Sequence, residues 1–158
     1  MKKQKGFSLI ELLIVVAIIL IIAAIAIPNL LRSRMAANEA SAVGSIRTIN
    51  TAEVTFSTTY PSVGFANLAS LGGAASTCAT TATSTAACLI DDTLATGTKS
   101  GYTFAATATG TAPMVQYTAS AVPVVIGQSG QRGFFSDQSG VIRYDAAGAI
   151  PTTSSPAL

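Results

Sequence analysis

Histidine is absent from the sequence, and charged residues are scarce. Without histidine, the chain has no imidazole ligand for a metal ion and no histidine general base. Charged residues make up 10% of the 158 residues, whereas a soluble domain normally carries about 25%. The length allows one modest domain, and the low charge indicates that this domain works in an unusual setting. We expect no cofactor and no bound metal.

The few basic residues are unevenly placed along the chain. Of the 9 basic residues, Lys2, Lys3 and Lys5 precede the long apolar run, which leaves 6 basic against 7 acidic residues in the remainder. That remainder is nearly neutral and has no basic patch of the kind that phosphate backbones require, so specific nucleic-acid binding is not supported. A phosphate-binding loop is not expected either, because the sequence contains no Gly-Lys pair.

Only two cysteines are present, Cys78 and Cys88. An even pair in an exported chain predicts one disulfide, and the alternative is two unrelated buried thiols. Around the pair the sequence is small, polar and almost uncharged. A disulfide that closes a loop of this size stabilises the fold by roughly 2–3 kcal/mol in the chain-entropy estimate.

A long apolar run occupies residues 7–27 and contains a single charge, Glu11. As a helix, these residues roughly span the hydrocarbon core of a bilayer, about 30 Å thick. The lysines before the run favour a cytoplasmic N-terminus, although Arg32 and Arg34 on the far side weaken that asymmetry.

Two simpler interpretations of the run compete. One is a cleaved secretory signal peptide, for which Ala24-Ile25-Ala26 offers a cleavage site. However, the run is longer than the usual 7–15 residues and carries a carboxylate near its start. The other is a plain signal anchor, in which Glu11 would be an unexplained cost of a few kcal/mol.

The helical pattern continues beyond the run. Pro28 should kink the helix, because proline removes one hydrogen bond and clashes with the preceding turn. We expect the helix to extend from about Phe7 to Tyr60, with Glu53 at the edge of its apolar face. Its second half is amphipathic, and the apolar positions recur at spacings of three, four and seven: Leu31, Met35, Ala42, Val43, Ile46, Ile49, Phe56 and Tyr60.

After the helix the pattern changes twice. Residues 61–101 are punctuated by glycine and proline and are expected to form a loop region. We then expect four antiparallel strands in a meander that packs on the apolar face of the helix, with Asp137-Gln138-Ser139-Gly140 as a hairpin turn. Pro113 and Pro123 should lie at strand ends or an edge, and residues 151–158 should be frayed. The β-rich segments begin at residue 102 and continue at 114–119, 122–126, 132–136 and 141–144.

The segment KGFSLIELLIVVAIILIIAAIAIPNLLRSR resembles the N-terminus of type IV prepilins and of type II secretion pseudopilins. The resemblance implies that a prepilin peptidase cuts between Gly6 and Phe7 and methylates the new N-terminus of Phe7. Glu11 matches the invariant carboxylate of the family, and Pro28 matches its helix-kinking proline. The implied fold is α+β and type IV pilin-like, with a long kinked N-terminal helix packed on a C-terminal antiparallel meander. The Cys78–Cys88 pair lies before the strands, whereas many pilins place their disulfide near the C-terminus.

The resemblance also implies an organisation and a set of partners. Residues 1–6 would be the leader, 7–27 the transmembrane and polymerisation half of the helix, 28–60 its amphipathic half, and 61–158 the head with the disulfide. The precursor would be stored in inner-membrane lipid, and an assembly platform with a cytoplasmic ATPase would drive its polymerisation with identical subunits. The assembled form would be an extracellular pilus or a periplasmic pseudopilus.

Glu11 has a physical reason to act in assembly. A buried polar group can fix alignment between helices at some cost in stability. We hypothesise that the amine exposed on a neighbouring subunit by cleavage satisfies this carboxylate. The favoured function is therefore a structural pilus subunit and not an enzyme. The alternatives are a pseudopilin and, less favoured, a singly anchored periplasmic binding module.

Several weaker signals have simpler explanations. Lys99-Ser100-Gly101 is found in penicillin-binding enzymes, but no Ser-x-x-Lys accompanies it here, so a loop turn is favoured. Asp91 and Asp92 could bind calcium, although adjacent acids are poorly spaced ligands and a solvated loop is preferred. The aromatic residues of the second half are expected in the core or an interface: Tyr102, Phe104, Phe134, Phe135 and Tyr144.

Overall fold

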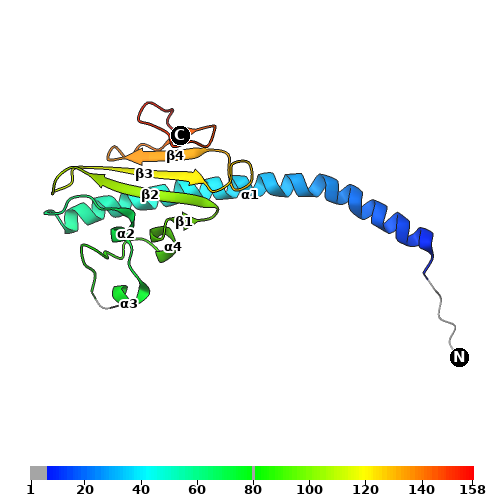
Figure 1. Cartoon of the computed structure of the whole chain (residues 1–158), viewed down its shortest axis with the longest axis horizontal. Helices are drawn as coiled ribbons and strands as arrows, with labels where there is room; N and C mark the ends of the chain where they lie inside the picture. The colour runs from blue at the N-terminus through cyan, green and yellow to red at the C-terminus, as the bar shows by residue number, and fades with distance from the viewer. Residues whose placement is uncertain (1–6, 80) are drawn as a thin grey trace. The chain divides into compact units, whose positions relative to one another are not determined.

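The computed structural model describes residues 7–79 and 81–158 and divides the chain into two units, residues 1–34 and 35–158. The predicted Gly6–Phe7 cleavage site therefore has one member, Gly6, outside the described residues. The first unit contains the start of the N-terminal helix. The second contains the rest of that helix, a β-sheet and the loops between them (Figure 1).

Helix α1 covers Leu9–Thr59, which confirms the predicted helix to within two residues at each end. Pro28 and Gly44 both lie inside it, so neither residue ends the helix. The kink expected at Pro28 stays a prediction. The first half is apolar all round, and in an apolar environment a helix satisfies its own backbone hydrogen bonds. The second half has the 3.6-residue periodicity of an amphipathic helix.

The second unit contains one antiparallel sheet in which every strand pairs with the next in sequence, order β1-β2-β3-β4-β5. The predicted meander is thus confirmed, and the structure adds β1, a two-residue strand that the sequence did not predict. The predicted β-rich segment 122–126 extends only partly into the sheet, because β3 ends at Pro123. The strands are β1 Thr98–Lys99, β2 Tyr102–Thr109, β3 Gln116–Pro123, β4 Gly133–Asp137 and β5 Arg143–Asp145.

The hairpin between β4 and β5 forms where the sequence predicts it. The N–H of Gly140 donates to the carbonyl of Asp137 at 2.9 Å, and the N–H of Ser139 donates to the Asp137 carboxylate at 2.9 Å. Gly140 has a φ of 71°, a left-handed conformation that glycine adopts without strain. The side chain of Asp137 and the flexibility of Gly140 therefore set the turn together.

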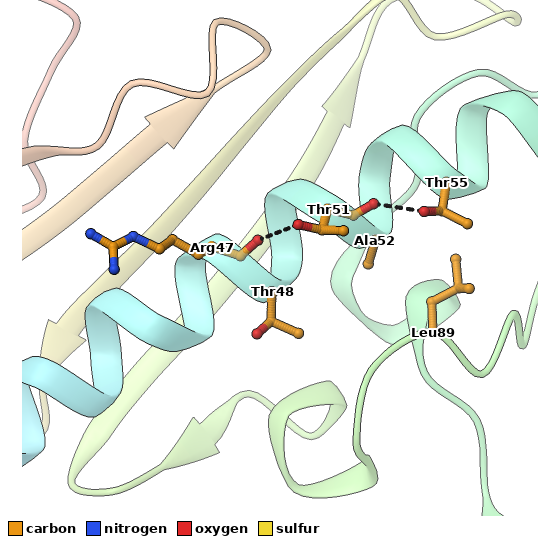
Figure 2. A pocket seen from close by; sticks show the side chains of 6 residues that line it. All are labelled: Arg47, Thr48, Thr51, Ala52, Thr55 and Leu89. Carbon is orange, nitrogen blue, oxygen red and sulfur yellow. Dashed lines mark hydrogen bonds between the residues drawn. The ribbon is translucent and has the colours of Figure 1, made fainter.

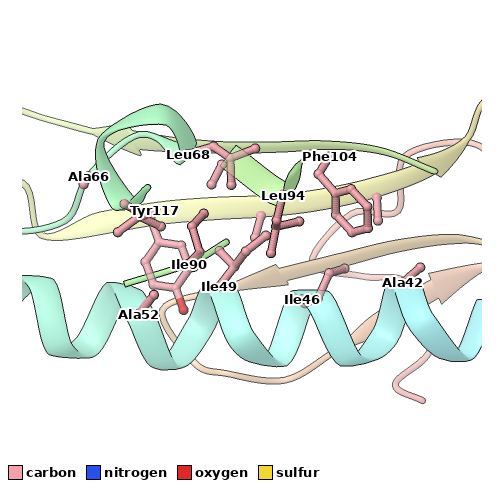
Figure 3. Close-up of a cluster of buried hydrophobic side chains, with 14 of the residues drawn as sticks. Ala42, Ile46, Ile49, Ala52, Ala66, Leu68, Ile90, Leu94, Phe104 and Tyr117 are labelled. Carbon is pink, nitrogen blue, oxygen red and sulfur yellow. The ribbon is translucent and has the colours of Figure 1, made fainter. Parts of the chain in front are cut away.

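One face of the sheet and one face of α1 form the core. Along β2 and β3 buried and more exposed residues alternate, as expected for a sheet with one covered face. On α1, Ile46, Ile49 and Phe56 are fully buried. Figure 3 shows Ile46 and Ile49 facing the sheet, with Tyr117 and Phe104 among the residues opposite. The expectation that these aromatic residues lie in the core is confirmed for Tyr102, Phe104, Phe134 and Phe135, which are buried, while Tyr144 is partly buried and packs against the core.

Residues 61–101 contain more structure than the expected loop region. Three one-turn helices occur here, and Leu71 and Leu94 within two of them are fully buried. The expectation of a loop region is therefore only partly right, because α2 and α4 bury leucines that the surrounding small polar residues obscure. These helices are α2 Leu68–Leu71, α3 Ala75–Cys78 and α4 Asp92–Ala95.

The C-terminal segment is ordered, which corrects the expectation of a frayed tail. The N–H of Tyr144 donates to the carbonyl of Pro156 at 3.0 Å, and the N–H of Leu158 donates to the carbonyl of Ile142 at 2.9 Å. Arg143 also donates from Nη1 to the carbonyl of Ser155 at 2.8 Å. The segment thus covers the free edge of β5 and satisfies backbone groups that would otherwise face solvent.

Candidate assembly and processing site

The described part of the first unit is an apolar helix whose side chains are almost all exposed. Its large apolar side chains from Phe7 to Leu30 are all exposed in the isolated chain. Within the described residues, α1 is the one helix long and apolar enough to cross a membrane, by length and composition. Exposed apolar surface on this scale requires a lipid or protein environment, because water does not solvate it favourably.

Glu11 lies in the first turn of α1, where its carboxylate points back to the helix start. Oε2 accepts a hydrogen bond of 2.9 Å from the backbone N–H of Ser8, the residue before the helix. This contact is half of a capping box, and the positive end of the helix dipole favours a negative charge here. A carboxylate has about four acceptor positions, so this contact leaves capacity for a further donor.

Glu39 connects α1 to the segment between β3 and β4. Its carboxylate accepts hydrogen bonds from the backbone N–H groups of Gln131 and Arg132, at 2.9 and 3.1 Å, and from Arg132 Nε at 2.8 Å. Burial would raise the pKa of Glu39, but these hydrogen bonds outweigh it and hold the pKa below its ordinary value of 4.5. Glu39 is therefore an ionised anchor that holds the strand connection to the helix.

Glu53 is fully buried, although the sequence places it only at the edge of the apolar face. Its Oε2 accepts a hydrogen bond of 2.9 Å from the backbone N–H of Ala66, while Oε1 has no partner among the described residues. Burial raises the pKa of Glu53 to about 7, and the Ala66 contact opposes that rise only in part. The sequence did not predict that Glu39 and Glu53 are buried. The other charged residues in the second half of α1 are exposed and lie away from its apolar face.

Cys78 and Cys88 form the predicted disulfide, with their Cα atoms 5.7 Å apart. The segment around Cys88 is itself anchored, because the N–H of Cys88 donates to the carbonyl of Gly72 at 3.1 Å and the N–H of Leu89 to that of Leu71 at 2.8 Å. The disulfide therefore attaches the end of α3 to a segment that hydrogen bonds already hold on α2.

Asp91 and Lys99 have structural roles. Asp91 is the N-cap of α4, and its carboxylate accepts hydrogen bonds from the N–H of Leu94 at 3.2 Å and from Lys99 Nζ at 3.0 Å. The Thr93 hydroxyl also donates to it and is the largest influence holding the pKa of Asp91 below its ordinary value. The Asp91 side chain is thus occupied by its own helix and a neighbouring lysine. Within the part of the chain that is described, no cluster of three or more metal-ligating side chains occurs.

An open groove of about 310 Å³ lies between α1 and Leu89. Figure 2 shows it lined by α1 side chains and Leu89, with the Thr51 hydroxyl donating to the carbonyl of Arg47 and the Thr55 hydroxyl to that of Thr51. Since the threonine hydroxyls bond to their own helix, this groove presents mainly methyl groups and one guanidinium.

Comparison with known proteins gives a match at the N-terminus. Residues 1–27 carry the motif described as the prokaryotic N-terminal methylation motif. The chain is 64% identical over 39 residues to the type IV wide pilus major component PilA4 of Thermus thermophilus, and 44% identical over 54 residues to the type IV major pilin protein PilA of Myxococcus xanthus. These alignments cover 25% and 34% of this chain and 30% and 24% of the relatives, so the similarity spans less than a third of each relative's length. No solved structure matches the chain.

The class of protein is thus an α+β chain with a long N-terminal helix that begins in a prepilin-type methylation motif. Among characterised proteins, its N-terminal region is similar to that of type IV pilins from two bacteria.

Proposed function

We propose that this chain is a structural subunit of a type IV pilus that polymerises through its N-terminal helix. One observation carries the proposal. The exposed apolar half of α1 is long enough to cross a membrane, has one carboxylate in its first turn, and begins within a methylation motif. The similarity to two major pilins supports it. We further propose that the precursor is a single-pass inner-membrane protein with a cytoplasmic N-terminus, and that the assembled form is a cell-surface filament.

Processing would prepare the helix for assembly. A prepilin peptidase would cut between Gly6 and Phe7 and methylate the amine of Phe7. The cut would remove Lys2, Lys3 and Lys5, the charges that favour retention of this end at the cytoplasmic membrane face. It would also leave an amine four residues before Glu11.

Glu11 would then align neighbouring subunits. The Ser8 contact occupies part of its acceptor capacity, and an amine from a second copy would supply a charge-assisted hydrogen bond. In an apolar surrounding an unpaired carboxylate is costly, so misaligned subunits would be disfavoured. The charge would thus select the register, while the aliphatic side chains would supply the contact area.

Assembly would require an external energy source. Burying an aliphatic side chain is worth roughly 1.5–3 kcal/mol relative to water, but the gain relative to lipid is much smaller, because lipid is equally apolar. Extraction from the membrane therefore fits an assembly platform with a cytoplasmic ATPase. The subunit itself would be structural and would catalyse no reaction.

Mass spectrometry of the N-terminus of the mature chain tests the proposal. We expect an N-terminal Phe7 that carries one methyl group. An intact Met1, or a cut after Ala26, would contradict processing of this kind and would favour a plain anchor or a secretory signal.

A second measurement separates the pilus subunit from a pseudopilin. Electron microscopy with a specific antibody should label surface filaments of the parent cells, and deletion of the gene should remove those filaments. Intact filaments together with a loss of secreted hydrolases would overturn the pilus assignment in favour of the pseudopilin.

A further inference from the structure

Glu53 lies in the core with one carboxylate oxygen unsatisfied. The residue is fully buried, its Oε2 accepts a hydrogen bond of 2.9 Å from the backbone N–H of Ala66, and its Oε1 has no partner among the described residues. A carboxylate has about four acceptor positions, and an ionised one that is deprived of donors and water is costly. The neutral carboxyl group is therefore the form that suits the closed structure.

The donor to Glu53 belongs to the connection between α1 and α2. We refer to residues 61–67 as the connecting segment. Within it, Phe65 and Asn67 are each hydrogen-bonded at 3.0 Å to a distant part of the chain, just before β3 and within β2 respectively. Ala66 lies between these two attachments, and its own N–H is bonded to Glu53. The Glu53 contact thus holds the residue between two fixed points.

Among the described residues, no positive charge is paired with Glu53. The two ion pairs involve other acids, and the nearest basic residue on α1, Arg47, is exposed. The connecting segment and α2 contain no charged side chain, and Tyr60 before them carries a phenol. From the sheet, Tyr117 of β3 interacts electrostatically with Glu53 and with Asp137 of β4. These neighbours are phenols and a further carboxylate, so none supplies the positive charge that would favour the ionised form.

A surface pocket borders the connecting segment. Its volume is about 150 Å³, enough for several water molecules, and its lining includes Phe56 of α1 together with Val63, Phe65 and Ala66 of the segment. Ala66 thus lines the pocket and also bonds to Glu53. A small movement of its peptide group would therefore join water in the pocket to the buried carboxylate.

We propose that ionisation of Glu53 opens the connecting segment at Ala66 and lets water from the pocket reach the carboxylate, while the rest of the second unit stays folded. Water would supply the donors that Oε1 lacks. Local opening at one residue requires less free energy than unfolding of the core, so it is the less costly response to the charge. Burial raises the pKa of Glu53 to about 7, so the segment is closed below this pH and open above it.

The opening would give the second unit two surfaces, one below and one above neutral pH. In the open form the pocket extends toward α1, and the backbone N–H of Ala66 is accessible to solvent. This response belongs to the second unit by itself, so it does not depend on the proposed membrane anchoring or assembly.

Hydrogen exchange of single backbone amides tests the proposal. The full chain would be studied in detergent micelles at pH 5 and pH 8 with NMR detection, and each rate would be expressed as protection relative to an unstructured peptide at the same pH. The amides of Gln131 and Arg132 are internal controls, because they bond to Glu39, a carboxylate with a lowered pKa. Glu53→Gln is the matched variant, because it keeps an acceptor for Ala66 and does not ionise.

The protection of Ala66 should depend on pH. At pH 8, one unit above a pKa of about 7, about ten ionised molecules exist for each neutral one. We therefore expect the protection of Ala66 to fall at least about tenfold from pH 5 to pH 8 and to approach that of an unstructured peptide. Gln131 and Arg132 should remain protected at both pH values, and Ala66 should stay protected in Glu53→Gln.

Three results would contradict the inference. The same protection of Ala66 at both pH values would overturn it, and the native chain alone decides this if the variant does not fold. Loss of protection at Ala66, Gln131 and Arg132 together would overturn it in favour of general unfolding. Loss at Ala66 in Glu53→Gln at pH 8 would overturn it by showing that another group opens the segment.

Discussion

At the scale of single residues, two buried acids of α1 have opposite electrostatic surroundings. Glu39 receives three hydrogen bonds, one of them from the Arg132 guanidinium, so it is held ionised. Glu53 receives one hydrogen bond and has one oxygen without a partner among the described residues, so burial favours its neutral form. The same residue type on the same helix therefore has a lowered pKa at one position and a raised pKa at the other.

Glu53 predicts a loss of stability as the pH rises from acidic to neutral values. Its folded-state pKa of about 7 lies above the ordinary 4.5, so its contribution is present below the unfolded value and is lost as pH rises through about 7. We expect the free energy of unfolding to fall by up to about 3 kcal/mol between pH 5 and pH 8. Urea unfolding of the detergent-solubilised chain, followed by tyrosine circular dichroism, measures this.

Glu53→Gln provides the control for that titration. It cannot ionise, so the fall in stability between pH 5 and pH 8 should largely disappear, and the variant should exceed the native chain at pH 8. With no histidine in the sequence, no imidazole titrates in this window. Burial, together with the nearby carboxylates of Glu53 and Asp137, raises the pKa of Tyr117 to about 12. Tyr117 therefore stays neutral between pH 5 and pH 8. An identical pH profile for both chains would contradict the prediction.

Glu39 predicts the opposite dependence. Its folded-state pKa is lowered, so its contribution is present above the unfolded value of about 4.5 and is lost as pH falls through the folded value. We expect Glu39→Gln to cost about 1–3 kcal/mol at pH 6, since a charged hydrogen-bond acceptor is lost. Asp92→Asn, an exposed acid in α4, is the matched control and should change stability by less than about 0.5 kcal/mol. Comparable losses in both variants at pH 6 would argue against an anchoring role of Glu39.

At the scale of elements, the disulfide stabilises the segment between Cys78 and Cys88, which buries little apolar surface. The described residues between Cys78 and Cys88 are small and mostly exposed, and residues 88 and 89 are held by backbone hydrogen bonds to α2. The covalent link therefore acts mainly on the end of α3 and the loop that follows.

Replacing both cysteines, Cys78→Ser with Cys88→Ser, should lower the free energy of unfolding by roughly 2–3 kcal/mol, because the unfolded chain regains the entropy of an open loop. Denaturant unfolding with and without a reductant measures the effect. The reductant should destabilise the native chain by a similar amount and leave the double variant unchanged. A variant as stable as the oxidised chain would contradict this account.

At the scale of the whole molecule, the chain combines an apolar helix half that is exposed in isolation with a head that has its own core. Exposed apolar surface of this extent is unfavourable in water and favours a lipid or protein surrounding. Under the proposed function, Glu11 would distinguish the two environments, because a carboxylate gains more from a partner amine than from lipid.

We therefore expect Glu11→Ala to insert into the membrane normally and to abolish or strongly reduce filament formation. Membrane fractionation and electron microscopy of cells that express the variant measure the two effects separately. Val16→Ala, which removes apolar surface without a charge, is the matched control and should still form filaments. Normal filaments from Glu11→Ala would refute the role of this residue in register.

Local signals were sufficient for much of the fold. The uninterrupted apolar run and the 3.6-residue periodicity predicted α1, alternation and turn residues predicted β2 to β5, and the even cysteine pair predicted the disulfide. The methylation motif around Glu11 could also be identified from adjacent residues. These features depend on neighbours along the chain, so one sequence contains the information for them.

Only the tertiary structure revealed the roles of Glu39 and Glu53, the position of the C-terminal segment along β5 and the contact of Asn38 with the turn that follows β3. Each depends on partners more than ten residues away: Arg132 for Glu39, Ala66 for Glu53 and Ser129 for Asn38. A helical pattern predicts which side of a helix a residue occupies. Whether a charge on that side is buried and paired depends on which distant backbone groups the fold brings to it.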